Sequence, residues 1–141
     1  MSDDKASDYR LSDQVGFNLR RANQRHIAIF AAHVDGLTPT QFAALARLYE
    51  KGPLSQNLLG RMTAMDSATI KGVVERLRAK HLVTSATDPD DLRLRRVELT
   101  DDGRAAFEAA QARALVARQE TLAPLDADEA RAFEALLEKL V

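Results

Sequence analysis

Residues 87–103, TDPDDLRLRRVELTDDG, gather charges of both signs within one short stretch. Three acids precede three arginines there: Asp88, Asp90, Asp91, Arg93, Arg95 and Arg96. Guanidinium groups are attracted to phosphates and to the negative potential of a DNA minor groove, whereas carboxylates are repelled. The acids therefore need another role. Asp88 and Asp90 flank a proline and favour a turn through side-chain hydrogen bonds to the backbone. Asp91, two residues before Arg93, can pair with that arginine and hold it extended.

An alternative interpretation is a solvated turn of mixed charge that contacts nothing, so the flanking sequence has to decide. The net charge of the chain is -1, but its positive charge is concentrated in the middle. Residues 55–97 carry eight Lys or Arg against five Asp or Glu, whereas residues 98–141 carry five against ten. This distribution is expected where one segment meets a polyanion and the rest does not.

Length and composition fit one globular domain over residues 1–141, with 45% hydrophobic and 29% charged residues. No apolar run reaches about 18 residues, and the N-terminal MSDDKASDYR lacks the apolar segment of a secretion signal. The absence of cysteine excludes disulfides, thiolate metal ligands and thiol nucleophiles. We therefore expect a cytoplasmic protein.

The first half of the chain predicts helices. Apolar residues recur on one face over residues 11–33, which predicts a long helix with Ser12 as its N-cap. The next helix is predicted over residues 38–50. Its start is strongly marked, because Thr38 and Gln41 have the spacing of a capping box and a proline occupies the first helical position.

Two further helices and a hairpin surround the charge cluster. Ser55 is predicted to cap a short helix to Met62, and Asp66 a helix to about Lys80. The latter has apolar residues at helical spacing: Ile70, Val73, Val74 and Leu77. Short strands are predicted at 82–86 and 95–99, on either side of the cluster.

Two C-terminal helices complete the pattern, one capped by Thr100 and running to about Leu122, the other begun by Asp126 and Glu129 as a capping box. The predicted fold class is mainly α with a small β-hairpin. Its middle is a winged helix-turn-helix whose wing is the charge cluster.

The helix at 66–80 has an unusual exposed face. Small residues stand opposite its apolar stripe, with polar residues on the flanks: Ala68, Gly72, Glu75 and Ala79, then Thr69, Lys71, Arg76 and Arg78. A mid-helix glycine costs roughly 1 kcal/mol relative to alanine, and close approach to another surface gives a reason for it. Such a face suits a helix in a DNA major groove. An ordinary solvated amphipathic helix is the alternative.

The stretches LTPTQFAALARL, SQNLLGRMTAMDSATIKGVVERLRAKHLV and DPDDLRLRRVELTDDG resemble the MarR family of bacterial transcriptional regulators. The resemblance covers roughly residues 11–140. Its most specific part is the D-x-R of the wing, at Asp91 and Arg93, and the L-T-x-x-G that follows at 99–103. It implies an obligate homodimer, bound as a repressor to a pseudo-palindromic operator in double-stranded DNA.

The resemblance also assigns parts to the chain. Residues 11–34 and 100–141 would form the dimerisation helices, and residues 38–99 the winged helix-turn-helix lobe. The predicted DNA contacts are Ser67, Thr69, Lys71, Arg76, Arg93 and Arg95, with Asp91 positioning the wing. Two positions depart from the family. Gly72 stands where an arginine is frequent, and His81 stands where a glycine usually ends the recognition helix, in a left-handed conformation that suits histidine less well.

Nothing in the sequence predicts catalysis. There is no glycine-rich phosphate loop and no nucleophile with a matched base, and His26 and His33 have no acid at metal-ligand spacing. We therefore expect that the protein is not an enzyme and that it binds no metal or cofactor. A winged-helix module that binds other proteins is the alternative function, and salt-dependent DNA affinity would separate it from the leading one.

The stretch NLRRANQRHIAIF places polar groups on an apolar helix face, as pockets for aromatic acids do. It resembles family members tied to aromatic-compound catabolism. That implies an effector that is a small aromatic acid or its coenzyme A thioester, and the lack of cysteine argues against oxidant sensing. The predicted ligand residues are Arg20, Asn23, Arg25, His26 and Phe42. For His26, a structural hydrogen bond at the dimer interface is favoured over ligand contact.

Overall fold

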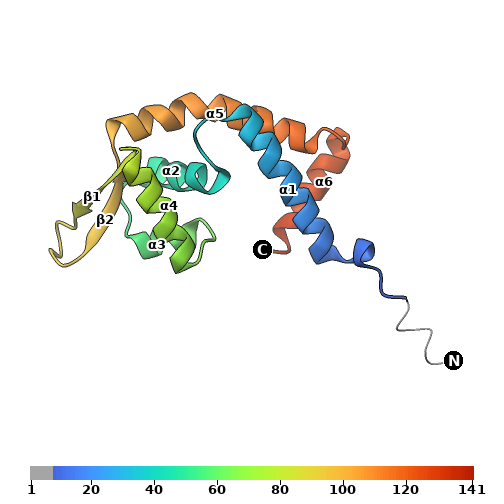
Figure 1. The fold of residues 1–141 in the computed structure, drawn as a ribbon, viewed down its shortest axis with the longest axis horizontal. Coiled ribbons are helices and arrows are strands. Elements are labelled where there is room, and N and C mark those ends of the chain that lie inside the picture. Colours follow the sequence, from blue (N-terminus) through green and yellow to red (C-terminus); the bar gives the residue numbers. More distant parts are fainter. Residues whose placement is uncertain (1–7) are drawn as a thin grey trace.

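The computed structural model describes residues 8–141, and it confirms the predicted order of elements (Figure 1). Within these residues a short 3-10 helix, η2, precedes six α-helices and one hairpin. The bounds are η2 Leu11–Asp13, α1 Val15–His33, α2 Pro39–Lys51, α3 Gln56–Met62, α4 Ser67–Ala79, β1 Val83–Thr87, β2 Arg95–Leu99, α5 Asp101–Leu122 and α6 Ala127–Glu138. The fold is a mainly helical winged helix-turn-helix, as expected.

The molecule is an arch (Figure 1). Helix α5 crosses the top, a lobe of α2, α3, α4 and the hairpin hangs from one end, and α1 and α6 descend from the other. Helix α1 packs against α5, and α2 packs against α3, α4 and α5. Helix α5 therefore connects the two sides of the arch.

The hydrophobic core fills the lobe and reaches α5. The predicted stripe of α4 is buried in full, at Ile70, Val73, Val74 and Leu77. Leu45 and Leu48 of α2 and Leu59 of α3 complete the contact between the three helices. Phe30 of α1 and Phe107 of α5 extend the same core to the top of the arch.

Side-chain caps fix most helix starts as predicted. Thr38 and Gln41 form the complete capping box of α2, and Asp126 and Glu129 form that of α6. Ser55, Asp66 and Thr100 each accept a backbone N–H at the start of α3, α4 and α5.

The predicted start of α1 is wrong. Ser12 lies inside the 3-10 turn rather than at an N-cap, and α1 begins at Val15 after Gln14, whose side chain forms no cap bond. The backbone carbonyl of Ser12 instead accepts a hydrogen bond from Asn18 Nδ2, at 3.1 Å. This bond folds the 3-10 turn back onto the first turn of α1.

The hairpin pairs Val83 with Leu99 and Thr87 with Arg95, so β1 begins one residue later than predicted. The N–H of Leu82 is used by α4, since it donates to Leu77 O. A feature not predicted is a bridge from the α2–α3 loop, where Leu54 and Val97 exchange both backbone hydrogen bonds. The loop thereby fixes the base of the wing against the lobe.

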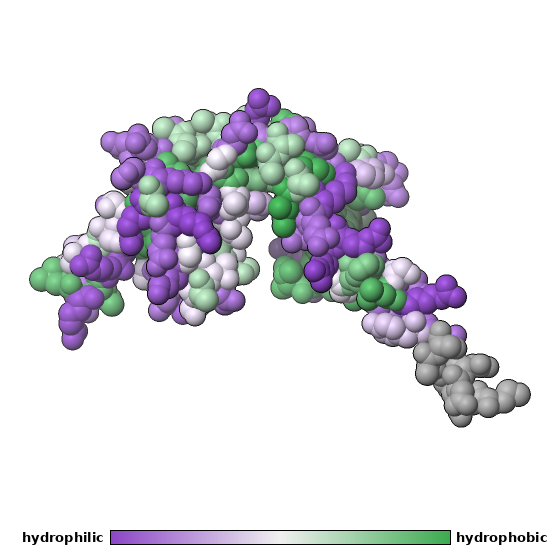
Figure 2. Space-filling model, viewed as in Figure 1, coloured by the Kyte–Doolittle hydropathy of each residue, from purple (hydrophilic) through white to green (hydrophobic). Residues whose placement is uncertain are grey.

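The α1–α6 side of the arch exposes apolar surface, shown in green in Figure 2. Helix α6 has no buried side chain. The large exposed apolar residues of this side are Leu11, Val15, Leu19 and Ile27 near or in α1, Leu115 and Val116 in α5, and Phe133, Leu136, Leu137 and Leu140 in or after α6. No helix between residues 8 and 141 is long and apolar enough to cross a membrane.

Candidate DNA interface and effector pocket

Helix α4 presents the predicted DNA-contacting residues to solvent. Ser67 and Lys71 lie on one flank of its exposed face and Thr69 and Arg76 on the other, and all four are exposed. Asp66 orders the first turn, because its Oδ1 accepts the Thr69 N–H at 2.8 Å. The same backbone hydrogen bond is the main cause of the lowered pKa of Asp66. The carboxylate therefore stays ionised beside the helix N-terminus, where the macrodipole favours negative charge.

Gly72 lies between these flanks with little around it. A Cβ built there would meet one side chain within 4 Å, at 3.5 Å from Arg76 Nη1. Arg76, one turn further on, therefore reaches back over the position where the family often has an arginine. That distance is an ordinary van der Waals contact, so the packing within the chain does not itself require glycine at this position.

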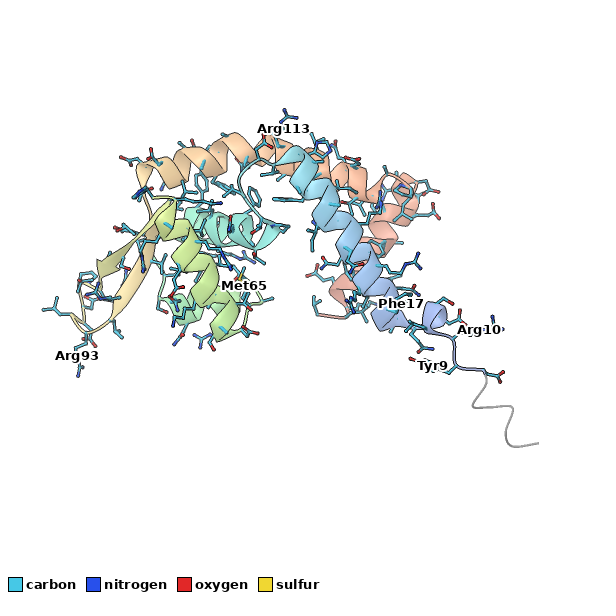
Figure 3. All side chains as sticks on the ribbon, in the orientation of Figure 1. Tyr9, Arg10, Phe17, Met65, Arg93 and Arg113 are labelled. Carbon is cyan, nitrogen blue, oxygen red and sulfur yellow. The ribbon has the colours of Figure 1, made fainter. Side chains whose placement is uncertain are left out.

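Arg93 extends from the tip of the wing, away from the body of the molecule (Figure 3). Its side chain is 91% exposed. Asp91 Oδ1 accepts both the Arg93 N–H, at 3.0 Å, and Nε, at 3.2 Å. The predicted pairing of Asp91 with Arg93 is present in the structure.

The other arginines of the cluster differ in accessibility. Arg96 Nε donates to Asp88 Oδ2 at 3.0 Å, while Asp88 Oδ1 accepts the Asp90 N–H at 2.8 Å. The Asp90 N–H is the main cause of a lowered Asp88 pKa, and Arg96 lowers it further. Arg95 is exposed at the start of β2. Asp88 and Arg96 therefore build the wing, whereas Arg93 and Arg95 remain available for contact.

The end of α4 adopts the conformation that the family's glycine predicts. His81 has φ +60°, and the N–H groups of His81 and Leu82 donate to the carbonyls of Arg78 and Leu77, which forms a Schellman cap. The carbonyl of His81 accepts the Thr100 hydroxyl at 2.7 Å. This bond ties the end of α4 to the start of α5.

Close packing explains why the last residue of the L-T-x-x-G stretch, Gly103, is a glycine. A Cβ at this position would lie 1.9 Å from the carbonyl oxygen of Leu82. The N–H of Thr100 donates to that same oxygen at 3.1 Å, and the Gly103 N–H donates to the Thr100 hydroxyl at 3.0 Å. The first turn of α5 is therefore pressed against the end of α4.

An open pocket of about 630 Å³ lies between α1 and the start of α2. Its wall on α1 is largely apolar, and its other wall comes from the α1–α2 turn and the first turn of α2. The lining includes Asn23, Ile27, Phe30, Thr38, Gln41 and Lys80.

Of the five predicted ligand residues, Asn23 lines this pocket and the other four do not. Arg20 is exposed on the same face of α1 as Asn23 and Ile27, at helical spacing beyond the outer end of the pocket. Phe42 packs behind Phe30, with ring centroids 5.7 Å apart.

Arg25 and His26 face α5 instead. The Arg25 guanidinium donates to the carbonyls of Thr121, at 2.8 Å, and Glu120, at 3.0 Å, so it satisfies carbonyls at the C-terminal end of α5. His26 Nδ1 lies 2.8 Å from Thr121 Oγ1. The structural hydrogen bond expected for His26 is thus present, within one chain rather than across an interface.

The bond to Thr121 also fixes which ring nitrogen of His26 carries the proton. Thr121 Oγ1 donates to Ala117 O at 2.9 Å, so it accepts from Nδ1. In the neutral ring Nε2 is then the acceptor, and it has no hydrogen-bond partner within residues 8–141. His26 therefore combines a structural bond with a nitrogen that remains available.

Lys80 lines the pocket, although the sequence analysis did not predict it as a ligand residue. Its Nζ donates to Gly36 O and to Gln41 Oε1, the latter at 3.0 Å. The sequence marks Lys80 as the end of a helix. Its hydrogen bond to Gln41, 39 residues earlier in the chain, depends on tertiary packing. Helical periodicity in the sequence cannot predict such a contact.

Known proteins share this architecture. The MarR family model matches residues 37–95, the lobe and most of the wing. The repressor NicR of Pseudomonas putida is 42% identical over 135 residues, which are 94% of this chain and 85% of that protein. A crystal structure of a probable transcriptional regulator from Pseudomonas aeruginosa is 53% identical with a TM-score of 0.91, over 94% of this chain and all of that one.

A second solved structure, of BpsR from Bordetella bronchiseptica, is described as showing regulation of DNA binding by 6-hydroxynicotinic acid. It is 42% identical with a TM-score of 0.88, over 94% of this chain and 96% of that one. Helix order, wing and sequence identity along nearly the whole length lead to one conclusion: this chain belongs to the MarR family of transcriptional regulators.

Proposed function

We propose that the protein is a dimeric repressor, released from its operator by a small aromatic acid or its coenzyme A thioester. One observation carries the DNA-binding part: the first turn of α4 and the wing tip with Arg93 lie toward the same side of the lobe (Figures 1 and 3). A single duplex can therefore meet both. The repressor NicR and the DNA-binding protein BpsR, both 42% identical, support this assignment.

Helix α4 would lie in the major groove with Ser67, Thr69, Lys71 and Arg76 toward the bases and phosphates. Threonine and lysine side chains can reach base edges there, while Gly72 permits close approach of the helix. The wing would place Arg93 and Arg95 at the adjacent minor groove, whose potential attracts guanidinium groups.

The exposed apolar surface of α1, α5 and α6 supports a homodimer. A helix such as α6, which buries no side chain within its own chain, needs a partner to cover its apolar face. A two-fold dimer would place two α4 helices on successive major grooves. The expected operator is therefore pseudo-palindromic, with half-site centres about 10–10.5 bp apart.

The pocket between α1 and α2 is the proposed effector site. Its volume of about 630 Å³ lies within the usual range for small-molecule sites, and its apolar α1 wall suits an aromatic ring. Asn23 supplies a polar group, and Arg20, one turn before it on the same face of α1, is a candidate cation beyond the outer end of the pocket. BpsR makes 6-hydroxynicotinic acid the first acid to try. Release requires that the acid bind the free dimer more tightly than the DNA-bound dimer.

The DNA-binding part is tested with a duplex selected from a random pool and an unrelated duplex of equal length. Lys71→Ala and Thr69→Ala should weaken binding to the selected duplex more than to the unrelated one, because contacts to base edges carry the sequence information. An equal loss of affinity for both duplexes would show that α4 is not the helix that reads the base sequence. Affinity that is weak and insensitive to salt would favour a protein-binding module instead.

A further inference from the structure

Lys80 lies where the pocket meets the DNA-reading helix. It is the C-cap residue of α4, and it is the cation among the residues that line the pocket. Its ammonium bonds to the carbonyl of Gly36 in the α1–α2 turn and to Gln41 in the first turn of α2. One side chain therefore joins α4, the turn and α2.

Gln41 is the buried acceptor of this junction. The residue is 5% exposed, and its Oε1 accepts hydrogen bonds from Lys80 Nζ, at 3.0 Å, and from the Thr38 N–H, at 3.3 Å. A buried amide oxygen needs such partners. The oxygen that completes the capping box of α2 is thus also the acceptor for the lysine of α4.

The ammonium keeps capacity for a further acceptor. An ammonium has three N–H donors, and within residues 8–141 two acceptors are bonded to Nζ. Ile27 and Phe30 form part of the facing apolar wall, so an aromatic ring packed there would place its carboxylate within reach of the Lys80 ammonium. Asp35 also lines the pocket, so an anionic ligand would lie with its charge toward Lys80 and away from that carboxylate.

We infer that the carboxylate of an aromatic acid binds Lys80 Nζ, and that occupancy of the pocket acts on α4 through this residue. The inference rests on the proposed function. It names the cation that binds the effector in the same pocket and the residue through which binding acts on α4. A ligand oxygen bound to the third N–H pulls the ammonium toward the pocket and so weakens its bonds to Gly36 and Gln41. Because Lys80 directly follows the last residue of α4, this loosens the attachment of α4 to α2.

Calorimetry on the full-length protein tests the charge pairing. The probes are 6-hydroxynicotinic acid and 4-hydroxybenzoic acid, each compared with its neutral amide. The wild-type protein should bind an acid roughly 10- to 100-fold more tightly than its amide, as expected for a bond to a charged group. Lys80→Met should abolish this preference, and Lys80→Arg should retain most of it. Lys51→Met, which removes a lysine at the end of α2 outside the pocket lining, should leave it unchanged.

Amide hydrogen exchange over residues 76–82, in the absence of DNA, tests the transmission. A saturating acid should speed exchange there in the wild-type protein and not in Lys80→Met. If Lys80→Met keeps the full preference for acid over amide, the inference is overturned. If the acid still releases that variant from DNA, the proposed function stands. Saturating acid that changes α4 and releases DNA equally in both proteins would overturn the transmission route. A wild-type protein that binds neither acid would remove the proposed effector site and the role of Lys80 together.

Discussion

At the scale of single residues, the acids and arginines of the wing form two pairs with different roles. Asp88 and Arg96 are the less exposed pair, since the Asp88 side chain is 14% exposed and also accepts the N–H of Asp90. Asp91 and Arg93 stand at the tip, where an exposed ion pair adds little to stability. We therefore propose that Asp91 holds Arg93 in an extended position.

This division predicts the behaviour of two substitutions on DNA. Arg93→Ala should lower affinity and reduce the slope of log affinity against log salt by about one, because one cation near phosphate is lost. Asp91→Ala should give a smaller loss in the same direction. Fluorescence anisotropy at several salt concentrations measures both. Tighter binding by Asp91→Ala would mean that the carboxylate acts only by repelling DNA.

His81 predicts a gain in stability. Its φ of +60° is a conformation that costs a residue with a Cβ roughly 1–2 kcal/mol, and glycine avoids that cost. His81→Gly should therefore raise the free energy of unfolding by about 1 kcal/mol, with the Thr100 bond to the backbone carbonyl preserved. Ala79→Gly, two residues earlier in helical conformation, should lower it by a similar amount. Urea unfolding distinguishes the two, and equal losses would show that the left-handed cap carries no strain.

Two substitutions can separate the structural bond of His26 Nδ1 from any contact that its Nε2 makes with the effector. Thr121→Val removes the partner of Nδ1 but keeps the imidazole, whereas His26→Ala removes both nitrogens. Both variants should lower the melting temperature. If Nε2 contacts the effector, His26→Ala should in addition blunt the response to acid, with operator affinity within a few fold of wild type. An unchanged response in His26→Ala would make the residue purely structural.

At the scale of elements, the contact between α4 and α5 fixes how the lobe is held. Gly103→Ala would place a methyl group into the carbonyl of Leu82, and a backbone atom cannot rotate away. We expect a loss of about 3 kcal/mol or more in the free energy of unfolding. Gly16→Ala is the control, because nothing lies within 4 Å of a Cβ there. A mild effect of Gly103→Ala in thermal unfolding would show that α4 and α5 can separate without penalty.

Sequence patterns predicted the elements well where the signal is local. Capping residues and apolar spacing located α2, α3, α4, α5 and α6 to within a residue or two, since N-caps and helical periodicity depend on neighbours in the chain. The start of α1 failed for a local reason as well. Ser12 has the right chemistry for a cap, but the chain forms a 3-10 turn there before the helix begins.

The pocket was less predictable because it depends on contacts between distant residues. Asn23 lines the pocket between α1 and α2, whereas Arg25 bonds to the end of α5, 95 residues away. Lys80 reaches Gly36 across 44 positions. Helical periodicity shows which face of a helix is the most apolar. It cannot show which other element will pack against each face.

At the scale of the whole molecule, the uncovered apolar side predicts the oligomeric state. Light scattering at micromolar concentration should return twice the chain mass of 15.6 kDa. Leu136→Asp in α6 should shift the mass toward the monomer and weaken operator binding, because it places a charge on the surface that a partner would cover. Leu92→Asp, at an exposed leucine of the wing, should leave the mass unchanged. A wild-type mass near 15.6 kDa would overturn the dimer.

The length of α5 has a mechanical consequence. Its 22 residues make it about 33 Å long at a rise of 1.5 Å per residue, and it spans from the lobe to the α1–α6 side (Figure 1). It therefore acts as a lever arm with the lobe at its far end. A tilt of about 6° would carry that end through roughly 3.5 Å, which is more than the length of a hydrogen bond. In the proposed DNA complex, a tilt of this size would be enough to break the contacts between α4 and the base edges.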